Sequence, residues 1–576
     1  MSDRTTVDPQ HHPNDSHEHD PPTRLGPLRA PRVFIPAAAI VLVFVAIAIA
    51  MPDRLSDLLT TANNTVVVDL GWWYVAIVTG FVAFALWMAL SPMGDIVLGK
   101  DDEEPEFGLK SWFAMLFAAG MGIGLVFWGV AEPLNHYAAP PPGSEAQTGT
   151  AAAGRAAMDT TFLHWGLHAW GIYVVVGLAV AYAVHRKGRP ISLRYALEPL
   201  FGKKVLGFWG DLIDVVAIVG TLFGVATSLG FGVTQVGAGL SYLGVVEEAG
   251  TGLLVVLVVA ITAMALASVI SGLDKGIKLL SNINMGLAGV LLAVVLLLGP
   301  TVFILSDFVT QIGSYLQNFL RLSFDVKPFQ GDEGSSWLSG WTTYYWGWWM
   351  SWAPFVGIFI ARISRGRTVR EFVLGVMLVP TLVTMLWFSI MGGSAIYREM
   401  FGGGGLIAED GSVSTDTALF QLLDGLPASG LLAVLFMALV TIFFVTSSDS
   451  GSFVVDMLAE GGDQNPPVWS RAFWGTMEGL IAIVLLLVGS GGLAAMQTSA
   501  ILVAAPFSIV MVLMVIATAK ALLAENGVRQ RAKRKWLARE VAHELHTNDD
   551  YDLSVTTNGS SNGTATGTAQ QPVERV

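Results

Sequence analysis

Four tryptophans fall within seven residues in the middle of a long apolar segment. The stretch reads Tyr-Tyr-Trp-Gly-Trp-Trp-Met-Ser-Trp from Tyr344 to Trp352. Tryptophan in membrane proteins concentrates at the headgroup level, near the ends of a span. Tryptophans at mid-span need another role, and their π faces are suited to holding a cation. The stretch therefore predicts a cation-binding site, with aromatic core packing as the alternative.

A second aromatic cluster lies in another apolar segment, at Trp165, Trp170 and Tyr173. At 100° per residue, Trp170 and Tyr173 share one face of a helix, and Trp165 lies about 80° from Tyr173. Rings from this segment, with Trp348 and Trp349 from the first cluster, could surround a methylated ammonium, which has no N–H to satisfy. Each ring contributes about 0.5–2 kcal/mol. We therefore predict an aromatic box shared by two segments.

Hydroxyl side chains mark a third apolar segment, which reads Phe-Phe-Val-Thr-Ser-Ser-Asp-Ser from Phe443 to Ser450. Adjacent hydroxyls at Thr446, Ser447 and Ser448 are costly in hydrocarbon and indicate an ion path. The alternative is that these hydroxyls bond to carbonyls of their own helix. A sodium site becomes the better interpretation if this segment meets free backbone carbonyls of another helix.

Alternating glycines supply such a place. The stretch 118–124 reads Ala-Ala-Gly-Met-Gly-Ile-Gly, and each glycine costs a helix roughly 1 kcal/mol relative to alanine. We expect the helix to break here, and backbone groups freed within a membrane must line a cavity or bind something. The alternative is close helix packing, because Gly120 and Gly124 also fit a small-xxx-small contact.

The composition places these segments in a membrane protein. Hydrophobic residues make up 53% of the 576 residues and charged residues 13%, against about 25% in soluble domains. A bilayer span takes about 20 residues, and about twelve apolar segments reach that length. They run roughly over 32–51, 72–92, 110–134, 161–185, 208–241, 252–272, 281–305, 338–361, 371–394, 429–458, 469–490 and 494–523. Cysteine is absent, which excludes disulfides and thiolate chemistry.

Lysine and arginine cluster on alternate loops. They are Arg24, Arg29 and Arg32 before the first segment, Arg186, Lys187, Arg189, Arg194, Lys203 and Lys204 after the fourth, Lys275 and Lys278 after the sixth, Arg362, Arg365, Arg367 and Arg370 after the eighth, and Arg529, Arg531, Lys533, Arg534, Lys535 and Arg539 after the twelfth. By the positive-inside rule, both termini are cytoplasmic and the number of spans is even. We expect a multi-pass protein of the plasma (inner) membrane.

The third and eighth segments are each the first of five. Both carry helix-weakening residues, which in the eighth are Gly347 and Pro354. Interrupted segments at equivalent positions of two halves indicate the substrate site of an inverted-repeat transporter. Apolar residues at helical spacing over Ser306 to Leu322 predict a helix between the halves, either at the membrane interface or packed on the surface.

An enzyme or a channel fits the sequence less well than a carrier. The histidines within the predicted spans are His164 and His168, and they form no recognisable nucleophile–base pair. A channel should show a symmetric pore motif, and we find none. We expect no enzymatic activity, no organic cofactor and no nucleic-acid partner.

Three motifs together resemble the betaine/choline/carnitine transporter family over nearly the whole membrane region. They are Gly120-Met-Gly-Ile-Gly-Leu-Val-Phe-Trp-Gly-Val-Ala-Glu-Pro133, Trp348-Trp-Met-Ser-Trp-Ala-Pro-Phe355 and Ala361-Arg-Ile-Ser-Arg-Gly-Arg367. The resemblance implies an all-α membrane protein with a LeuT-like 5+5 inverted repeat, in which spans 3–7 and 8–12 follow two extra helices. It also implies a homotrimer that takes up compatible solutes.

The resemblance assigns substrate-binding roles to particular positions. The aromatic box would comprise Trp165, Trp170, Tyr173, Trp348 and Trp349, with Trp352 as a nearby gate. The glycine-rich stretch would hold the carboxylate region of the substrate. Its residues are Gly120, Met121, Gly122 and Gly124.

The resemblance also bears on the coupling ion. Sodium-coupled members keep a glycine at position 124, where proton-coupled choline carriers tend to place an aspartate. The sodium ligands would be carbonyls of Ala118, Met121 and Phe443 and hydroxyls of Thr446 and Ser447. A second ion site near Thr221 and Phe355 needs a hydroxyl four residues after Thr221, where this chain has Val225. The number of sodium ions therefore stays open.

We expect a sodium symporter that imports glycine betaine or a related quaternary ammonium zwitterion by alternating access, for osmoprotection. The alternatives are a proton-coupled choline carrier and a sodium-independent carnitine/betaine exchanger. The solute stays open among betaine, choline, carnitine, ectoine and proline. The domains expected are a disordered cytoplasmic tail over 1–31, a transporter domain over 32–523 (repeat one about 110–305, interfacial helix about 306–322, repeat two about 338–523), a basic cytoplasmic helix over 524–546 that could bind anionic lipid, and a disordered tail over 547–576.

Overall fold

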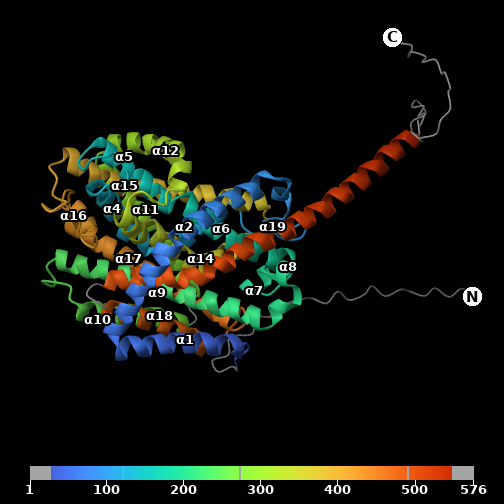
Figure 1. Ribbon diagram of the computed structural model, residues 1–576, viewed down its shortest axis with the longest axis horizontal. Coiled ribbons are helices and arrows are strands. Elements are labelled where there is room, and N and C mark those ends of the chain that lie inside the picture. The colour runs from blue at the N-terminus through green and yellow to red at the C-terminus, as the bar shows by residue number, and fades with distance from the viewer. Residues whose placement is uncertain (1–27, 121, 272–273, 489–491, 548–576) are drawn as a thin grey trace, which may run out of the picture. The chain divides into compact units, whose positions relative to one another are not determined.

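The protein is an all-α integral membrane protein (Figure 1). The computed structural model describes residues 28–547 apart from 121, 272–273 and 489–491. It describes the backbone alone at 67–68, 117–120, 269, 271, 274–278, 492–493 and 545–547. Within this part of the chain there is no β-strand, only an isolated bridge between Val97 and Thr368. The expected disordered tails fall almost wholly on 1–27 and 548–576, outside the described residues.

The first half of the chain contains helices that alternate with short turns. They are α1 (Pro31–Ala50), α2 (Pro52–Leu90), η1 (Pro92–Asp95), α3 (Leu109–Gly120), α4 (Ile123–Ala138), α5 (Ala151–Trp165), α6 (Leu167–Ala181), η2 (Tyr182–Arg186), α7 (Leu193–Ala196), α8 (Glu198–Phe201), η3 (Gly202–Leu206), α9 (Phe208–Tyr242), α10 (Thr251–Ser271) and α11 (Asp274–Leu298).

The second half is built in the same way. Its elements are α12 (Thr301–Ser323), α13 (Gly331–Leu338), η4 (Ser339–Thr343), α14 (Tyr344–Arg362), α15 (Val369–Phe401), α16 (Ala418–Leu423), α17 (Ser429–Ala459), α18 (Val468–Leu487) and α19 (Gly492–Thr547).

Ten helices in the described ranges are long and apolar enough to cross a membrane. The two predicted spans that are not among them are the third and the eighth. The third is divided between α3 and α4, which have 12 and 16 residues, and the eighth is the 19-residue, aromatic-rich α14. Adding the α3–α4 pair and α14 to the ten gives the twelve segments expected from the sequence.

The predicted break in the third span is confirmed. Helix α3 ends at Gly120, and α4 begins at Ile123 after Gly122, whose backbone is extended (φ −141°, ψ −166°). Gly122 has no side chain that could cap α4. The glycines of this stretch weaken the helix, and the chain breaks between Gly120 and Ile123. Met121, between the two helices, lies outside the described residues.

The predicted break in the eighth span is wrong. Helix α14 runs without interruption through Gly347 and Pro354, and the irregular turn precedes it as the π-helical η4. A Cβ at Gly347 would lie 2.8 Å from the Cα atom of Ile501 on α19. This glycine therefore lets two helices approach each other and does not interrupt its own.

A break that the sequence reading missed divides the fourth span at Gly166. Helix α5 ends at Trp165 and α6 begins at Leu167. A Cβ at Gly166 would lie 2.4 Å from the carbonyl oxygen of Phe162, so this turn requires glycine. The helical-wheel angle between Trp165 and Tyr173 assumed a continuous helix and does not hold.

Close helix contacts place the two aromatic segments beside each other. Helix α14 packs against both α6 and α9, and α17 packs against α9. A Cβ at Gly357 on α14 would lie 2.6 Å from Val176 and 3.0 Å from the backbone nitrogen of Gly177 on α6. Helices α6 and α14 thus approach each other at backbone distance.

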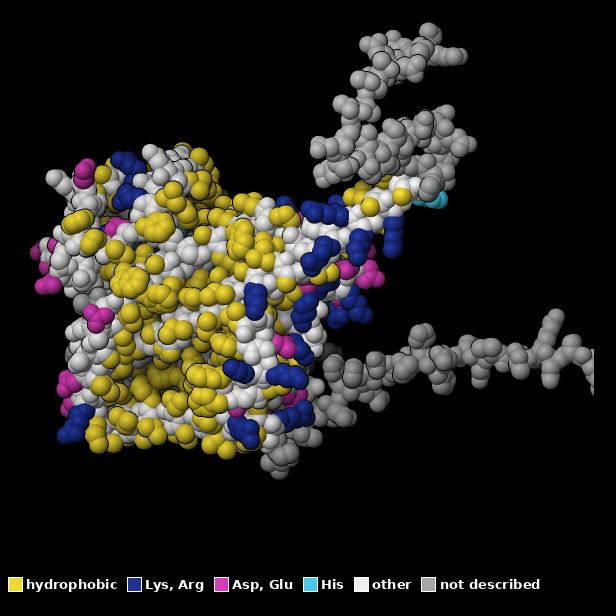
Figure 2. Space-filling model, turned by 45° about the vertical axis from the view of Figure 1, so that its right-hand side comes forward, with side chains coloured by type: hydrophobic (Ala, Val, Ile, Leu, Met, Phe, Trp, Pro, Cys, Tyr) yellow, Lys and Arg dark blue, Asp and Glu magenta, His cyan; other side chains and the backbone are white. Residues whose placement is uncertain are grey.

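Hydrophobic side chains cover the outer face shown in Figure 2, and charged side chains gather at its edges. Helix α12 adds an exposed apolar stripe at Val302, Val309, Leu316 and Leu320. Its other side packs on α5, where Ser314 and Asn318 donate hydrogen bonds to Asp159. Helix α12 therefore packs on α5 with one side and exposes an apolar face on the other. Its place at the membrane interface stays a prediction.

The chain divides into two compact units after Leu523. The second unit, taken by itself, consists in its described part of the end of α19. Its side chains over 531–544 are exposed, among them Trp536, Leu537 and Val541. The helix expected over 524–546 is therefore present as a continuation of α19.

Candidate substrate and ion sites

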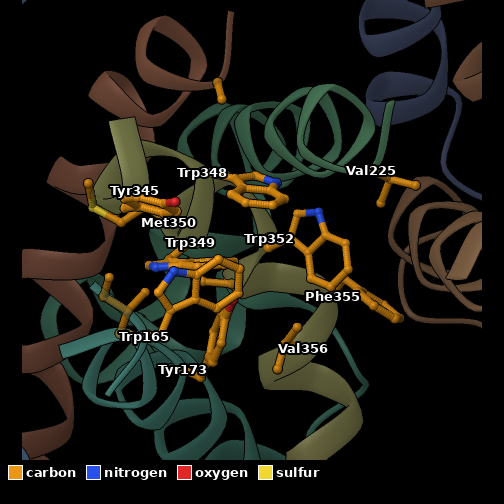
Figure 3. Packing of buried hydrophobic residues seen from close by; sticks show 14 of the residues in the cluster. Trp165, Tyr173, Val225, Tyr345, Trp348, Trp349, Met350, Trp352, Phe355 and Val356 are labelled. Atoms are coloured by element: carbon orange, nitrogen blue, oxygen red, sulfur yellow. The ribbon is translucent and has the colours of Figure 1, made fainter. Parts of the chain in front are cut away.

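Five aromatic rings from α5, α6 and α14 meet in one cluster, which we call the aromatic box (Figure 3). Trp348 and Trp349 stack with ring centroids 4.6 Å apart. Trp165 meets the Trp349 ring edge to face at 4.8 Å and lies 5.5 Å from the Tyr345 ring. Tyr173 reaches Trp349 at 6.5 Å. Four predicted box residues thus come together, and the structure adds Tyr345.

Trp170 and Trp352 lie at the edges of this cluster. Trp170 contacts Tyr173, with ring centroids 5.5 Å apart. Trp352 stands apart from the stacked pair, on the side of Val225 and Phe355 (Figure 3). The indole nitrogen of Trp352 is buried without a hydrogen-bond partner in the described part of the chain, so this ring is less firmly held than the others.

The glycine-rich stretch runs directly past the rings. A Cβ at Gly124 would lie 2.5 Å from Trp348 and 3.1 Å from Trp165, and one at Gly122 would lie 3.4 Å from Trp352. Position 124 therefore has no room for a side chain in this conformation. The side-chain surroundings of Gly120 are not described, and Met121 lies outside the described residues.

Hydrogen bonds hold both rings of the stacked tryptophan pair. The Trp348 indole donates to the Ser228 hydroxyl at 3.2 Å, and the Trp349 indole donates to the carbonyl oxygen of His164 at 2.9 Å. The box residues are all buried, with 0–6% of each residue exposed. The box is therefore closed to solvent, and a solute can enter only when helices move apart.

Glu132 lies in the motif that runs from Gly120 to Pro133, and the sequence predicted no role for it. In the structure it organises the box. Its carboxylate accepts hydrogen bonds from the Trp165 indole at 2.6 Å and from the Tyr345 hydroxyl at 2.5 Å. Its other oxygen lies 2.7 Å from Nδ1 of His164, whose Nε2 pairs with the Thr342 hydroxyl at 2.9 Å. One acid thus ties together rings from α5 and α14.

The histidines near the box differ in their surroundings. Glu132, His136 and His164 are fully buried and have ligand atoms close enough to share a metal ion, but the carboxylate is already engaged by two aromatic donors. The His168 ring stacks on Trp346 at 5.3 Å, and neither of its nitrogens finds a partner among the described residues. His168 is therefore a packing residue among the described side chains.

Three of the expected sodium ligands, Phe443, Thr446 and Ser447, lie on α17. The Thr446 hydroxyl donates to the carbonyl oxygen of Ile442 at 2.9 Å, as the back-bonding alternative requires, and also lies 3.2 Å from the Phe443 carbonyl oxygen. Ser447 is half-buried beside it. Of the partners on the third span, Ala118 ends up in α3 with its side chain not described, and Met121 is outside the described residues.

Helix α17 does approach the break in the third span. A Cβ at Gly232 on α9 would lie 3.1 Å from Ile123, at the start of α4, and 3.5 Å from Val440 on α17. Val440 lies one turn before Phe443. Side chains of α17 and of the start of α4 thus border the same glycine of α9, and the sodium site at Phe443, Thr446 and Ser447 stays a prediction.

The second ion position has a hydroxyl at one end only. Thr221 is buried and donates to the carbonyl oxygen of Ala217 at 2.8 Å. Val225 and Phe355, both buried, offer no side-chain oxygen to an ion.

Comparison with known proteins identifies the family to which this chain belongs. The model of the betaine/carnitine/choline family transporters matches residues 32–527. An uncharacterized transporter of Mycobacterium tuberculosis is 52% identical over 85% of this chain and 82% of its own length. The glycine betaine transporter OpuD of Bacillus subtilis is 47% identical over 84% and 92%. A glycine betaine/proline/choline transporter of Vibrio parahaemolyticus is 40% identical over 88% and 92%.

These proteins are transporters and not enzymes, and the family match covers the whole membrane region. Because the family model matches residues 32–527 and the relatives cover most of both chains, this chain belongs to the betaine/carnitine/choline family of transporters.

Proposed function

We propose that this protein imports glycine betaine, or a related quaternary ammonium zwitterion, by sodium symport. The observation that carries the proposal is the aromatic box, in which Trp165 of α5 meets Trp348 and Trp349 of α14 beside Gly124. A quaternary ammonium has no N–H group, so π faces satisfy it without an ion pair. The names of two relatives, which include glycine betaine, support the same class of solute.

Transport requires the box to open on alternate sides. The rings are buried and in mutual contact, so the solute must separate α5 and α6 from α14 before it can lie between them. Binding energy from the rings would offset the cost of that separation. Rocking of one repeat against the other around a fixed midplane site accomplishes this in inverted-repeat transporters.

Sodium is the coupling ion that the residues favour. Carbonyl and hydroxyl oxygens suit a small hard cation, and Phe443, Thr446 and Ser447 provide them on α17. The approach of α17 to the start of α4 supports a site shared with the carbonyls of Ala118 and Met121. We propose import at the plasma membrane for osmoprotection, with both termini cytoplasmic and three copies assembled as a homotrimer.

Uptake of labelled betaine into proteoliposomes tests the proposal. We expect uptake under an inward sodium gradient to exceed uptake under an equal potassium gradient several-fold, and a sodium ionophore to abolish the difference. Equal uptake in the two salts would overturn sodium coupling. Choline, carnitine, ectoine and proline in excess, each added as a competitor, would rank the solutes.

A proton-coupled choline carrier or a sodium-independent exchanger is the alternative within the family. The close approach of Trp348 to Gly124 disfavours a carrier of the first kind, because an aspartate at position 124 cannot be accommodated without moving both rings. Choline uptake that follows an imposed pH gradient in sodium-free buffer would favour that alternative.

A further inference from the structure

A second buried acid lies away from the aromatic box, between α17 and α18. Glu478 is fully buried on α18, a helix long and apolar enough to cross the membrane. One carboxylate oxygen, Oε2, accepts hydrogen bonds from Ser448 and Ser452 on α17, each at 3.0 Å. The other oxygen, Oε1, is buried and has no hydrogen-bond partner in the part of the chain that the structure describes.

This carboxylate lacks a compensating charge. Its electrostatic neighbour among the described ionisable groups is another acid, Asp449, and no lysine, arginine or histidine of the described residues pairs with it. Burying an unpaired carboxylate anion in hydrocarbon is very costly. Ionisable groups at such positions therefore mark ion or proton pathways in membrane proteins. Glu478 must carry a proton or hold a bound cation.

The unpartnered oxygen, Oε1, and Val225 on α9 both lie close to Gly451 on α17. A Cβ at Gly451 would lie 3.3 Å from Oε1 of Glu478 and 3.1 Å from the side chain of Val225. Val225 is the residue that leaves the expected second ion position without a hydroxyl. Oε1 of Glu478 and the side chain of Val225 thus border the same glycine of α17, which places the carboxylate in the neighbourhood of the position that lacks a hydroxyl.

We propose that Glu478, with Ser448 and Ser452, forms a second cation site of this transporter, which takes up a proton or a sodium ion in each transport cycle. The two serines hold Oε2 and leave Oε1 for the cation. The inference rests on the proposed function, because it gives the symporter a second coupling ion beside the sodium ion near Phe443 and Thr446.

The helices packed against α18 add few other charges to this region. Besides Asp449, α17 carries Asp456, which accepts a hydrogen bond from Ser470. Helix α9 carries Asp211 and Asp214 near its start, which both pair with Arg194. Helix α10 has no ionisable residue, and α1 has Arg32 in its first turn. Glu478 and Asp449 are therefore the acids of α17 and α18 that meet at this place, and Glu478 is the one that is fully buried.

The test compares full-length wild type with Glu478→Gln in proteoliposomes. Glutamine keeps the size and one acceptor oxygen of glutamate but cannot take up a charge. Asp159→Asn is the matched control, because Asp159 is also buried and accepts hydrogen bonds from Ser314 and Asn318, far along the chain from both ion positions. The measurements are the number of cation charges per betaine, from the membrane potential that balances a betaine gradient, the number of labelled sodium ions taken up per labelled betaine, and the internal pH, from a trapped dye.

We expect Glu478→Gln to move one cation fewer per betaine than wild type, whereas Asp159→Asn moves the same number as wild type. Loss of one sodium ion identifies sodium as the occupant. Loss of betaine-driven acidification with an unchanged sodium count identifies the proton.

Two results would overturn the inference. One is an equal cation count and equal acidification for wild type and Glu478→Gln, which would make Glu478 a purely structural acid. The other needs no variant, and so decides the matter even if Glu478→Gln fails to fold: wild type that moves a single cation per betaine has no second site. Failure of the proposed function would look different, as equal wild-type uptake in sodium and potassium.

Discussion

At the scale of single residues, the box depends on side chains that fix the rings as well as on the rings themselves. Trp349 illustrates this, because its ring stacks on Trp348 and its indole donates to the backbone of His164. A solute that enters the box gains contact with a ring that is already oriented. Loss of that ring therefore affects both stability and binding.

Trp349→Leu should weaken betaine binding by about 2- to 30-fold, which corresponds to the 0.5–2 kcal/mol of one cation–π contact. It should also lower the melting temperature, because a smaller side chain leaves a cavity. Trp387→Phe is the control, since Trp387 is equally buried and donates to the carbonyl oxygen of Leu125 outside the box. Titration of tryptophan fluorescence with betaine measures the affinity, and an unchanged affinity in Trp349→Leu would remove this residue from the site.

Glu132→Gln should reduce betaine affinity although Glu132 touches no proposed solute atom. The carboxylate orients Trp165 and Tyr345, and a hydrogen bond to a charged group contributes about 1.5–3 kcal/mol. We expect a several-fold rise in the betaine KM with a smaller change in kcat, and partial rescue by Glu132→Asp. A loss of stability with an unchanged KM would limit Glu132 to a structural role.

At the scale of helices, glycine decides how closely the elements carrying the site approach each other. Gly124 allows α4 to pass beneath the rings, and Gly357 allows α14 to touch the backbone of α6. Both contacts are shorter than a Cβ permits. The positions of the aromatic residues therefore depend on residues that contribute no side chain.

Gly124→Ala should weaken betaine binding roughly tenfold, because the added methyl group displaces Trp348 and Trp165, and overpacking typically costs about 1–3 kcal/mol. Gly80→Ala on α2 is the matched control, since a Cβ there meets nothing within 4 Å. Fluorescence titration and thermal unfolding of both variants check the expectation. Wild-type affinity in Gly124→Ala would show that the rings adjust freely.

At the scale of the whole molecule, the membrane domain and the C-terminal unit are distinct. The first unit ends at Leu523 and contains all residues proposed to bind solute or cations. The side chains of the second unit are exposed over 531–544, and the stretch 529–539 is rich in lysine and arginine. Basic residues beside a membrane are attracted to anionic lipid by about 1 kcal/mol each.

Removal of residues 524–576 should leave the betaine KM unchanged and reduce the dependence of transport rate on anionic lipid. The measurement is uptake in proteoliposomes with and without a quarter of anionic phospholipid. A truncated protein with the same lipid response as the full chain would contradict a lipid-binding role for the basic helix.

The sequence alone determined the membrane character, the twelve segments, the break near Gly122 and most residues of the box. These follow from local properties: apolar length, glycine content and residue type. Periodicity could not show that α14 stays continuous at Gly347 while the fourth span breaks at Gly166, because a glycine weakens its own helix in both cases and only the neighbouring helix decides which result follows.

The tertiary structure alone decided which polar groups meet across helices. Nothing in the spacing of Glu132, Trp165 and Tyr345, or of Val225, Ser448 and Glu478, indicates that they share a place, because their contacts join segments 30 to more than 200 residues apart. A buried polar group must find its partner wherever the packed helices present one. The sequence therefore showed which polar and aromatic side chains lie in the apolar segments. Only the folded structure shows which of them pair with each other.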